Sequence, residues 1–247
     1  RGGLIIHLGC GDGKLTAALH ASDAYLVQGL DADPKNVEAA RQHIQSLDLY
    51  GAVSVEPWAG KTLPYADNLA NLVVAENFGG VTVDEAMRVL APGGVLCSKQ
   101  AGAWKKSVKP RPTNIDEWTH YLYDASGNPV SHDEVVAPPG RLQWTAGPSY
   151  TRSHEHTPSI FAMVAAGGRI FYISDEAPRA SIRATPQWTL IAQDAFNGVE
   201  LWQRPLSDWF PHIVGWTTAP TELERRLVAI GDRVYVTLGL HAPVSVL

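Results

Sequence analysis

The stretch His7-Leu8-Gly9-Cys10-Gly11-Asp12-Gly13 decides the fold of the first part of the chain. It follows the apolar run 4–6, Leu-Ile-Ile, and precedes the segment 14–19, whose residues favour a helix. Glycine has no Cβ, so a turn with glycines at alternate positions lets the backbone bend sharply and approach a ligand closely. The sequence therefore predicts a buried strand, a ligand-binding turn and a helix, in that order.

The spacing of the glycines distinguishes between the known kinds of nucleotide-binding turn. The dinucleotide fingerprint G-x-G-x-x-G would need glycine at position 14, where the chain has Lys14. The phosphate loop G-x-x-x-x-G-K-[ST] does not occur in the sequence. Gly9, Gly11 and Gly13 instead follow the pattern G-x-G-x-G. Both common phosphate-binding loops are therefore excluded.

Composition and charge narrow the class of protein. The 247 residues are 45% hydrophobic and 18% charged, with a formal net charge of −5. This balance is typical of a globular protein, and it gives no reason to expect a nucleic-acid partner. No apolar run approaches the ~20 residues of a membrane span, and Cys10 and Cys97 are too few for a disulfide framework. Because the chain begins at Arg1 without methionine and ends in a strand-like run, we expect a fragment of a longer protein.

Residues 1–100 alternate between two kinds of pattern. Short apolar runs typical of strands occupy 4–8, 24–30, 52–55, 69–75 and 94–98, and helical patterns occupy 14–20, 34–47 and 83–90. Pro34 suits the first turn of the second helix, and Asp33 suits its N-cap. Strands that alternate with helices predict a parallel sheet with crossover helices, so we expect an α/β Rossmann-like domain over residues 1–100.

The composition changes after Lys99. Seven of the eight tryptophans lie beyond this point, prolines become frequent and helical periodicity disappears. We expect residues 101–140 to form a linker or irregular joint, because turn signals cluster there. We expect residues 141–247 to form an all-β region, because strand-like runs occur at 142–145, 161–165, 169–174, 189–194, 199–203, 227–230 and 233–238.

The β-rich region contains an internal repeat. Segments 164–172 and 228–236 both read as a strand, a Gly-Gly or Gly-Asp turn, an arginine and a second strand. Between them, segment 192–202 has the pattern Ala-x-Asp-x-x-x-Gly-x-x-x-Trp and resembles the quinoprotein-like (PQQ-like) β-propeller repeat. The resemblance implies a partial β-propeller of less than two blades over 141–247; the alternative is an ordinary hairpin with a core tryptophan. A PQQ site needs partners from every blade of a full ring, so PQQ itself is not supported.

Two further segments accompany the glycine turn. Segment 63–68 reads Leu-Pro-Tyr-Ala-Asp-Asn, and segment 85–94 reads Glu-Ala-Met-Arg-Val-Leu-Ala-Pro-Gly-Gly. With the glycine turn, they make residues 4–99 resemble the class I S-adenosylmethionine-dependent methyltransferases. That family has a G-x-G-x-G turn, a Leu-Pro-Phe loop and an E-x-x-R-V-L-x-P-G-G segment in the same order. The resemblance implies S-adenosylmethionine as the cofactor.

The resemblance also implies which residues hold the cofactor. The glycines would lie against its methionine part, and Asp31, at the end of the second strand, would bind both ribose hydroxyls because a carboxylate offers two acceptors. The expected cofactor-binding set is Gly9, Gly11, Gly13, Asp31, His7 and Cys10. No catalytic residue is assigned, since methyl transfer to a good nucleophile depends mostly on positioning.

The sequence departs from the family pattern at functional positions. His7 stands where the family has an acidic residue near the cofactor's amino group. Trp-Ala-Gly-Lys at 58–61 stands where an adenine-side acidic residue is expected, although Glu56 lies nearby as a possible substitute. The antiparallel hairpin that ends the family's sheet is not evident after Lys99. Activity therefore stays open at this point.

A metal site is a weaker candidate. His154 and His156 are two apart and would point to one face of a strand, with His120, His132 and Asp133 available to complete a site. Polar loop residues give the same pattern, so no metal is assigned.

Two functions from different classes follow. The first is a methyltransferase acting on an unknown small-molecule or protein substrate, with the propeller binding substrate or a protein partner. The second is a propeller-based binding or scaffold protein, or a quinoprotein-like one, whose methyltransferase fold has lost its activity. The first implies the cytoplasm, whereas quinoprotein-like propellers are often exported to the periplasm.

Overall fold

The computed structural model describes residues 2–138, 140, 142–147, 159–179, 184–210 and 223–247. The chain forms two compact units. The first unit comprises Arg1–Pro112 with Phe196–Leu201, and the second comprises Thr113–Ala195 with Trp202–Leu247.

The first unit is built on a six-stranded sheet with the strand order β3-β2-β1-β4-β5-β6. Strands β1 to β5 pair in parallel and β6 is antiparallel to β5, so the predicted parallel α/β sheet is confirmed. The strands are β1 (Gly3–Leu8), β2 (Tyr25–Asp31), β3 (Val53–Pro57), β4 (Ala70–Ala75), β5 (Leu90–Gln100) and β6 (Ala103–Val108). The helices are α1 (Lys14–Ala18), α2 (Pro34–Ser46) and α3 (Val83–Val89).

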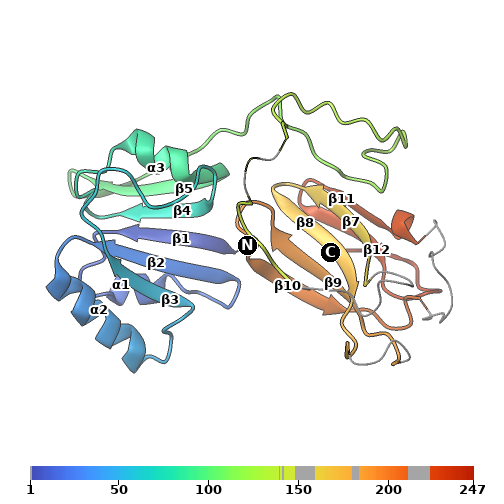
Figure 1. Cartoon of the computed structure of the whole chain (residues 1–247), viewed down its shortest axis with the longest axis horizontal. Helices are drawn as coiled ribbons and strands as arrows, with labels where there is room; N and C mark the ends of the chain where they lie inside the picture. Colours follow the sequence, from blue (N-terminus) through green and yellow to red (C-terminus); the bar gives the residue numbers. More distant parts are fainter. Residues whose placement is uncertain (1, 139, 141, 148–158, 180–183, 211–222) are drawn as a thin grey trace. The chain divides into compact units, whose positions relative to one another are not determined.

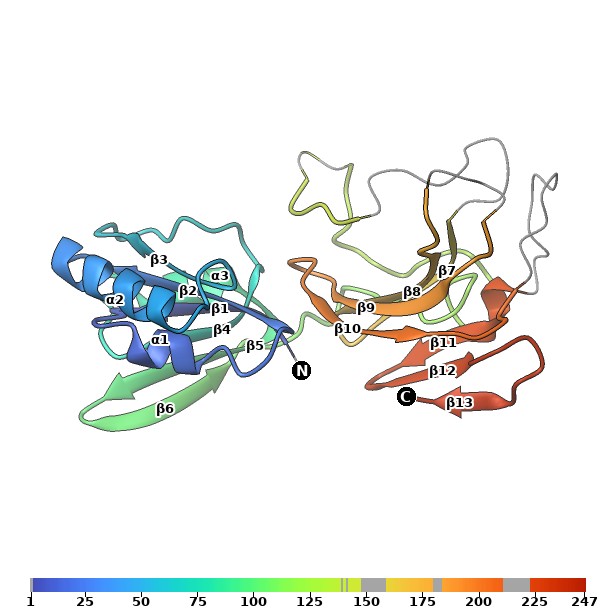
Figure 2. The same ribbon diagram turned by 90° about the horizontal axis from the view of Figure 1, so that it is seen from below.

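Helices cover both faces of this sheet (Figure 1 and Figure 2). Adjacent residues of a strand point to opposite faces, so Ile5 and Ile6 of β1 enter two different core clusters. Ile5 shares one cluster with Ile44 of α2, whereas Ile6 shares the other with Val89 of α3. Because β2 and β4 lie on opposite sides of β1, the chain reverses its direction of travel across the sheet there. Ligands of open α/β sheets bind at the carboxyl ends of the strands at such a point.

The structure differs from the sequence prediction at residue 101, where a linker was expected. Ala101 and Gly102, with φ of 48° and 81°, form a tight turn, and β6 then returns along β5 with Cys97 opposite Lys106. All six residues of β6 are exposed, so the strand lacks the alternation of apolar and polar residues that identifies a half-buried strand. The first unit accordingly extends to Pro112 instead of residue 100.

The second unit contains two antiparallel sheets. One has the order β10-β9-β8-β7 and the other β11-β12-β13. The strands are β7 (Ile160–Ala166), β8 (Arg169–Asp175), β9 (Trp188–Asp194), β10 (Glu200–Pro205), β11 (Leu227–Ile230), β12 (Arg233–Thr237) and β13 (Val244–Val246). The run 142–145, predicted as a strand, is irregular; Trp144 donates its indole N–H to the carbonyl of Ala195 over 3.0 Å.

The two halves of the internal repeat form matching hairpins, β7–β8 and β11–β12. Their turns contact each other: the Arg169 guanidinium donates to the carbonyl of Gly231 over 2.6 Å. The backbone at 118–119 joins the same two hairpins. Trp118 accepts from the amide of Ala165 over 2.7 Å, and Thr119 accepts from the amide of Ala229 over 3.0 Å. The repeated sequence therefore corresponds to a repeated structure, and part of the predicted joint is an ordered element of the second unit.

Asp116 organises the segment that begins the second unit. Its carboxylate accepts from the amide of His132 over 2.7 Å, from the hydroxyl of Ser131 over 3.2 Å and from the hydroxyl of Tyr123. Tyr123 is buried and has φ of 71°, a conformation that non-glycine residues rarely adopt. The hydroxyl of Tyr123 contributes most to lowering the pKa of Asp116 to about 2.

Asp116→Asn should lower the stability of the second unit, and the loss should depend on pH. A carboxyl whose pKa is depressed by folding stabilises the protein above its ordinary pKa of about 3.9. This contribution disappears as the pH falls through about 2. Urea unfolding from about pH 6 down to about pH 2 should show that the free energies of unfolding of wild type and variant differ at the higher pH and become similar at the lower one. Ser131→Ala, which removes a single donor, should cause a smaller loss of stability. If Asp116→Asn lost the same stability at every pH, the charge of Asp116 would not have this role.

Within the part of the chain that the structure describes, every helix is too short or too polar to cross a bilayer.

Candidate functional site

A cavity of about 250 Å³ lies in the first unit, at the carboxyl ends of the central strands. The glycine turn after β1, the end of β2 and the segment after β3 form its walls. The residues after β4 close it. Its lining includes Gly9, Gly11, Asp31, Trp58, Asn77 and Phe78. The cavity is therefore located where the reversal of strand order predicts a ligand.

The glycines of the turn have different structural roles. Gly13, at φ of 77°, precedes α1, and a Cβ there would lie 2.7 Å from the Cβ of Ala40 in α2. Gly11, at φ of 53°, has open space where a Cβ would be, and it lines the cavity. Gly13 thus lets α1 pack closely on α2, whereas Gly11 leaves room beside the backbone for a ligand.

Asp31 joins the turn to the start of α2. Its Oδ2 accepts from the amide of Gly11 over 2.9 Å, and its Oδ1 accepts from the amide of Asp33 over 2.9 Å and from the side chain of Asn36 over 3.1 Å. The residue is only 8% exposed, yet it lines the cavity. A carboxylate has about four acceptor sites, so these three bonds leave capacity for a hydroxyl donor. The side chain is fixed by the protein before any ligand arrives.

His7 and Cys10 lie behind the cavity and do not line it. His7 is 1% exposed, and its Nδ1 lies 2.9 Å from the hydroxyl of Thr16 in α1. Among the described residues, none makes a hydrogen bond with His7 Nε2. Cys10 belongs to the core beneath α1 and α2, and burial raises the pKa of its thiol to about 12. Neither residue presents a charge to the cavity in the way an acidic residue would.

The buried position of His7 should make stability depend on pH. Desolvation lowers its pKa below the ordinary value, although the carboxylates of Glu76 and Asp31 oppose the shift. The unfolded chain then binds a proton that the folded chain refuses, so the free energy of unfolding falls as the pH drops below about 6.5. The fall ends once the pH passes through the lowered folded-state pKa. Between these two pH values, the free energy of unfolding measured with urea should depend more steeply on pH for wild type than for His7→Asn. The same dependence on pH in both proteins would contradict a lowered pKa for His7.

Trp58 and the residues after β4 make the remaining walls of the cavity. The amide of Trp58 donates to the carbonyl of Asp31 over 2.8 Å, and its indole N–H finds no acceptor among the described residues. Glu56 binds Arg41 over 2.9 Å and does not line the cavity. Asn77 and Phe78 were missed by sequence reasoning. Their signal is positional, because they follow the buried strand β4, whose neighbour β1 leads into the glycine turn at the same edge of the sheet.

The candidate metal ligands that the structure describes are not brought together. His154 and His156 lie outside the described residues. Nδ1 of His132 lies 2.9 Å from the hydroxyl of Tyr123, and Asp133 accepts from two backbone amides of the following turn. Across the described ranges no group of three or more His, Cys, Asp or Glu side chains is placed to hold a metal ion.

The chain is similar in sequence or fold to several known proteins. Residues 5–94 match the family described as "Methyltransferase domain". No curated protein matches the chain significantly. A solved S-adenosyl-L-methionine-dependent methyltransferase, described as putative, from Methanococcus maripaludis is similar at 26% identity, over 40% of this chain and 48% of that one, with a TM-score of 0.37.

Two other solved structures give similar values. A complex between the Haloferax volcanii Trm112 methyltransferase activator and a protein described as the putative methyltransferase is 26% identical over 40% of this chain and 45% of that one, with a TM-score of 0.35. Geranyl diphosphate C-methyltransferase from Streptomyces coelicolor, solved with S-adenosyl-L-homocysteine, is 17% identical over 39% of this chain and 38% of that one, with a TM-score of 0.36. The chain thus spans less than half the length of each of these three structures.

Proposed function

We propose that the first unit binds S-adenosylmethionine in the cavity beside the glycine turn and transfers its methyl group to an acceptor. The observation that carries the proposal is the buried carboxylate of Asp31, held by the amide of Gly11 at the end of β2. It lies within the 5–94 segment that matches a methyltransferase domain. A carboxylate fixed in this way still has acceptor capacity for a hydroxyl of a ribose.

The residues present fit this cofactor at several points. Asp31 would hold the ribose, Gly9 and Gly11 would border the methionine part, and Trp58 would border the base. The cofactor would supply a methyl group bound to a sulfonium. The carbon–sulfur bond breaks as the methyl group passes to the acceptor, and the sulfur is left as a neutral thioether. The chain's own contribution is to orient that methyl group and to exclude water, and no acid or base of this chain is assigned. The acceptor is an unknown small molecule or protein.

Calorimetric titration of the whole chain with S-adenosylmethionine and with S-adenosylhomocysteine tests the proposal. We expect one site for either ligand and no binding of a nicotinamide dinucleotide, because Lys14 replaces the glycine that a dinucleotide turn requires. Absence of heat with both adenosyl ligands would overturn it. Transfer of a labelled methyl group to a candidate acceptor would then extend binding to activity.

We also propose that the two sheets of the second unit are parts of a β-propeller that serves as a binding module. The matching hairpins and the contact between their turns support this. A cavity of about 420 Å³ in this unit, lined among others by Arg169, Phe171 and Trp202, gives such a module a place to bind. This function would remain if the first unit proved unable to bind S-adenosylmethionine.

A further inference from the structure

One wall of the cavity depends on a segment with no helix or strand of its own. Residues 58–68 connect β3 to β4 as irregular backbone, and the cavity is lined by Trp58 and Gly60 at the start of this segment. Gly60 packs on the indole, since a Cβ there would lie 2.5 Å from the Trp58 ring. Backbone groups of irregular segments need partners from elsewhere in the protein. Those partners determine whether this wall keeps its shape.

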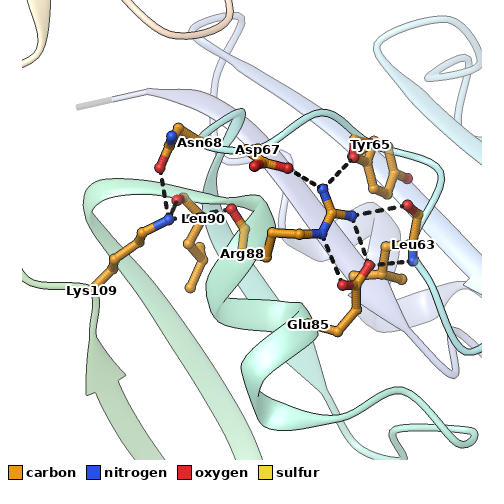
Figure 3. A network of polar contacts seen from close by, with 8 residues as sticks. All are labelled: Leu63, Tyr65, Asp67, Asn68, Glu85, Arg88, Leu90 and Lys109. Carbon is orange, nitrogen blue, oxygen red and sulfur yellow. Dashed lines mark hydrogen bonds and ion pairs between the residues drawn. The ribbon is translucent and has the colours of Figure 1, made fainter. Parts of the chain in front are cut away.

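Helix α3 supplies most of them through Glu85 and Arg88 (Figure 3). Glu85 accepts from the amide of Leu63 over 2.6 Å. The Arg88 guanidinium donates to the carbonyl of Leu63 over 3.2 Å and to that of Tyr65 over 2.9 Å, and it pairs with Asp67 over 2.6 Å. Arg88 also binds Glu85 through two parallel hydrogen bonds of 2.8 and 2.7 Å. One arginine therefore holds the segment at three alternate positions.

Further contacts tie the segment to the rest of the first unit. The side chain of Leu63 is 2% exposed and enters the core beneath α3, and the hydroxyl of Tyr65 donates to Gln28 of β2 over 2.7 Å. At the far end, the Lys109 ammonium donates to Asn68 over 2.7 Å and to the carbonyl of Leu90 over 2.7 Å. Arg88 is thus at the centre of a network that fixes residues 63–68 against both α3 and the sheet.

We infer that Arg88, together with Glu85, is a positioning residue for the cofactor, acting through the 58–68 wall. Neither residue lines the cavity, so neither touches the ligand directly. Trp58 and Gly60 are the residues of the 58–68 segment that line the cavity, so this wall presents no carboxylate to the base. Binding on this side then depends on the shape that Trp58 and Gly60 keep. The inference rests on the proposed function, since it assigns the wall to the base of S-adenosylmethionine.

We call the contacts of Arg88 and Glu85 with residues 63–67 the clamp. Its loss should weaken cofactor binding, because residues 58–68 would no longer be ordered before the ligand binds. Ordering a segment at the moment of binding subtracts from affinity, and a loss of about 1.4 kcal/mol corresponds to tenfold in Kd. For Arg88→Gln we expect the Kd for S-adenosylhomocysteine to rise about tenfold. Arg88→Lys keeps the charge but not the planar fork that reaches three positions, so we expect it to lie between Gln and wild type.

Two measurements on the whole chain test the inference. The first is the Kd by calorimetry, well below the unfolding temperature of each variant. The second is hydrogen–deuterium exchange, which should quicken in 58–68 while β1 and β2 keep their protection; a general loss of stability would quicken both. Arg41→Gln is the matched control, since it removes a 2.9 Å ion pair and a 3.0 Å bond to the carbonyl of Val55 without touching 63–68. We expect it to leave the Kd within about twofold.

The outcomes separate the two proposals. If the wild type binds neither adenosyl ligand, the proposed function is wrong, while exchange in 58–68 still reports on the clamp. If the wild type binds and Arg88→Gln binds equally well despite faster exchange, the positioning role is wrong. It is also wrong if the Kd rises with no change of exchange in 58–68. A rise in Kd with local loss of protection, absent in Arg41→Gln, supports it.

Discussion

Asp31→Ala should strongly weaken the binding of S-adenosylmethionine while leaving the chain folded. A hydrogen bond to a charged group contributes about 1.5–3 kcal/mol, so losing the carboxylate that would accept from a ribose hydroxyl should raise the Kd about ten- to a hundredfold. The same change removes the acceptor of the Gly11 amide, so the turn loses a contact that fixes its shape. Titration calorimetry of wild type and variant measures the effect.

Asp33→Ala provides the matched control. Asp33 lies two residues away and caps α2 by accepting from the amide of Lys35 over 2.9 Å. Removing such a cap costs about 1 kcal/mol of stability. We expect an unchanged Kd and a lower midpoint of urea unfolding. Equal binding by wild type and Asp31→Ala would show that the ligand does not use the end of β2.

Gly13→Ala should destabilise the first unit more than any other single methyl group added to the glycine turn. The left-handed conformation at φ of 77° costs a residue with a Cβ about 1–2 kcal/mol. The methyl group would also lie 2.7 Å from the Cβ of Ala40, and relieving that overlap adds ~1–3 kcal/mol. We expect a total loss of roughly 2–5 kcal/mol, measured as a shift in the midpoint of urea unfolding.

Gly11→Ala separates strain from contact. Gly11 has a similar φ of 53°, but nothing lies within 4 Å of its would-be Cβ. We expect only the backbone cost of about 1–2 kcal/mol, together with weaker binding of S-adenosylmethionine because the methyl group enters the cavity. Equal destabilisation by the two substitutions would mean that packing of α1 on α2 does not depend on Gly13.

The sheet and its ligand-binding edge could be predicted from sequence because each signal there is local. An apolar run before Gly9, an Asp-Pro pair at positions 33 and 34 and an apolar run at 69–75 each specify one element within a few residues. Asp31 was identified because it ends the second strand, where the resemblance to the methyltransferases implies an acidic residue for the ribose. Parallel order then brings the ends of these strands together.

The elements that were missed depend on contacts far apart in the sequence. β6 is exposed on both faces, so its register with β5 leaves no pattern of burial in the sequence. The segment 85–94 was recognised as a motif, but the three positions that Arg88 binds become evident only once 63–68 lies against α3. His7 was assigned to the ligand from its place in the motif, whereas the structure directs its Nδ1 to Thr16.

β6 also bears on how the first unit could be produced alone. An edge strand offers unpaired backbone groups to other molecules, and exposed lysines such as Lys105 and Lys106 discourage such aggregation. A polypeptide that ends at residue 100 would lack β6. The edge of β5, with the buried side chain of Leu96, would then be open to pairing with other molecules. A recombinant domain that ends at Pro112 keeps β6 beside β5, although the 196–201 segment of the first unit lies outside it.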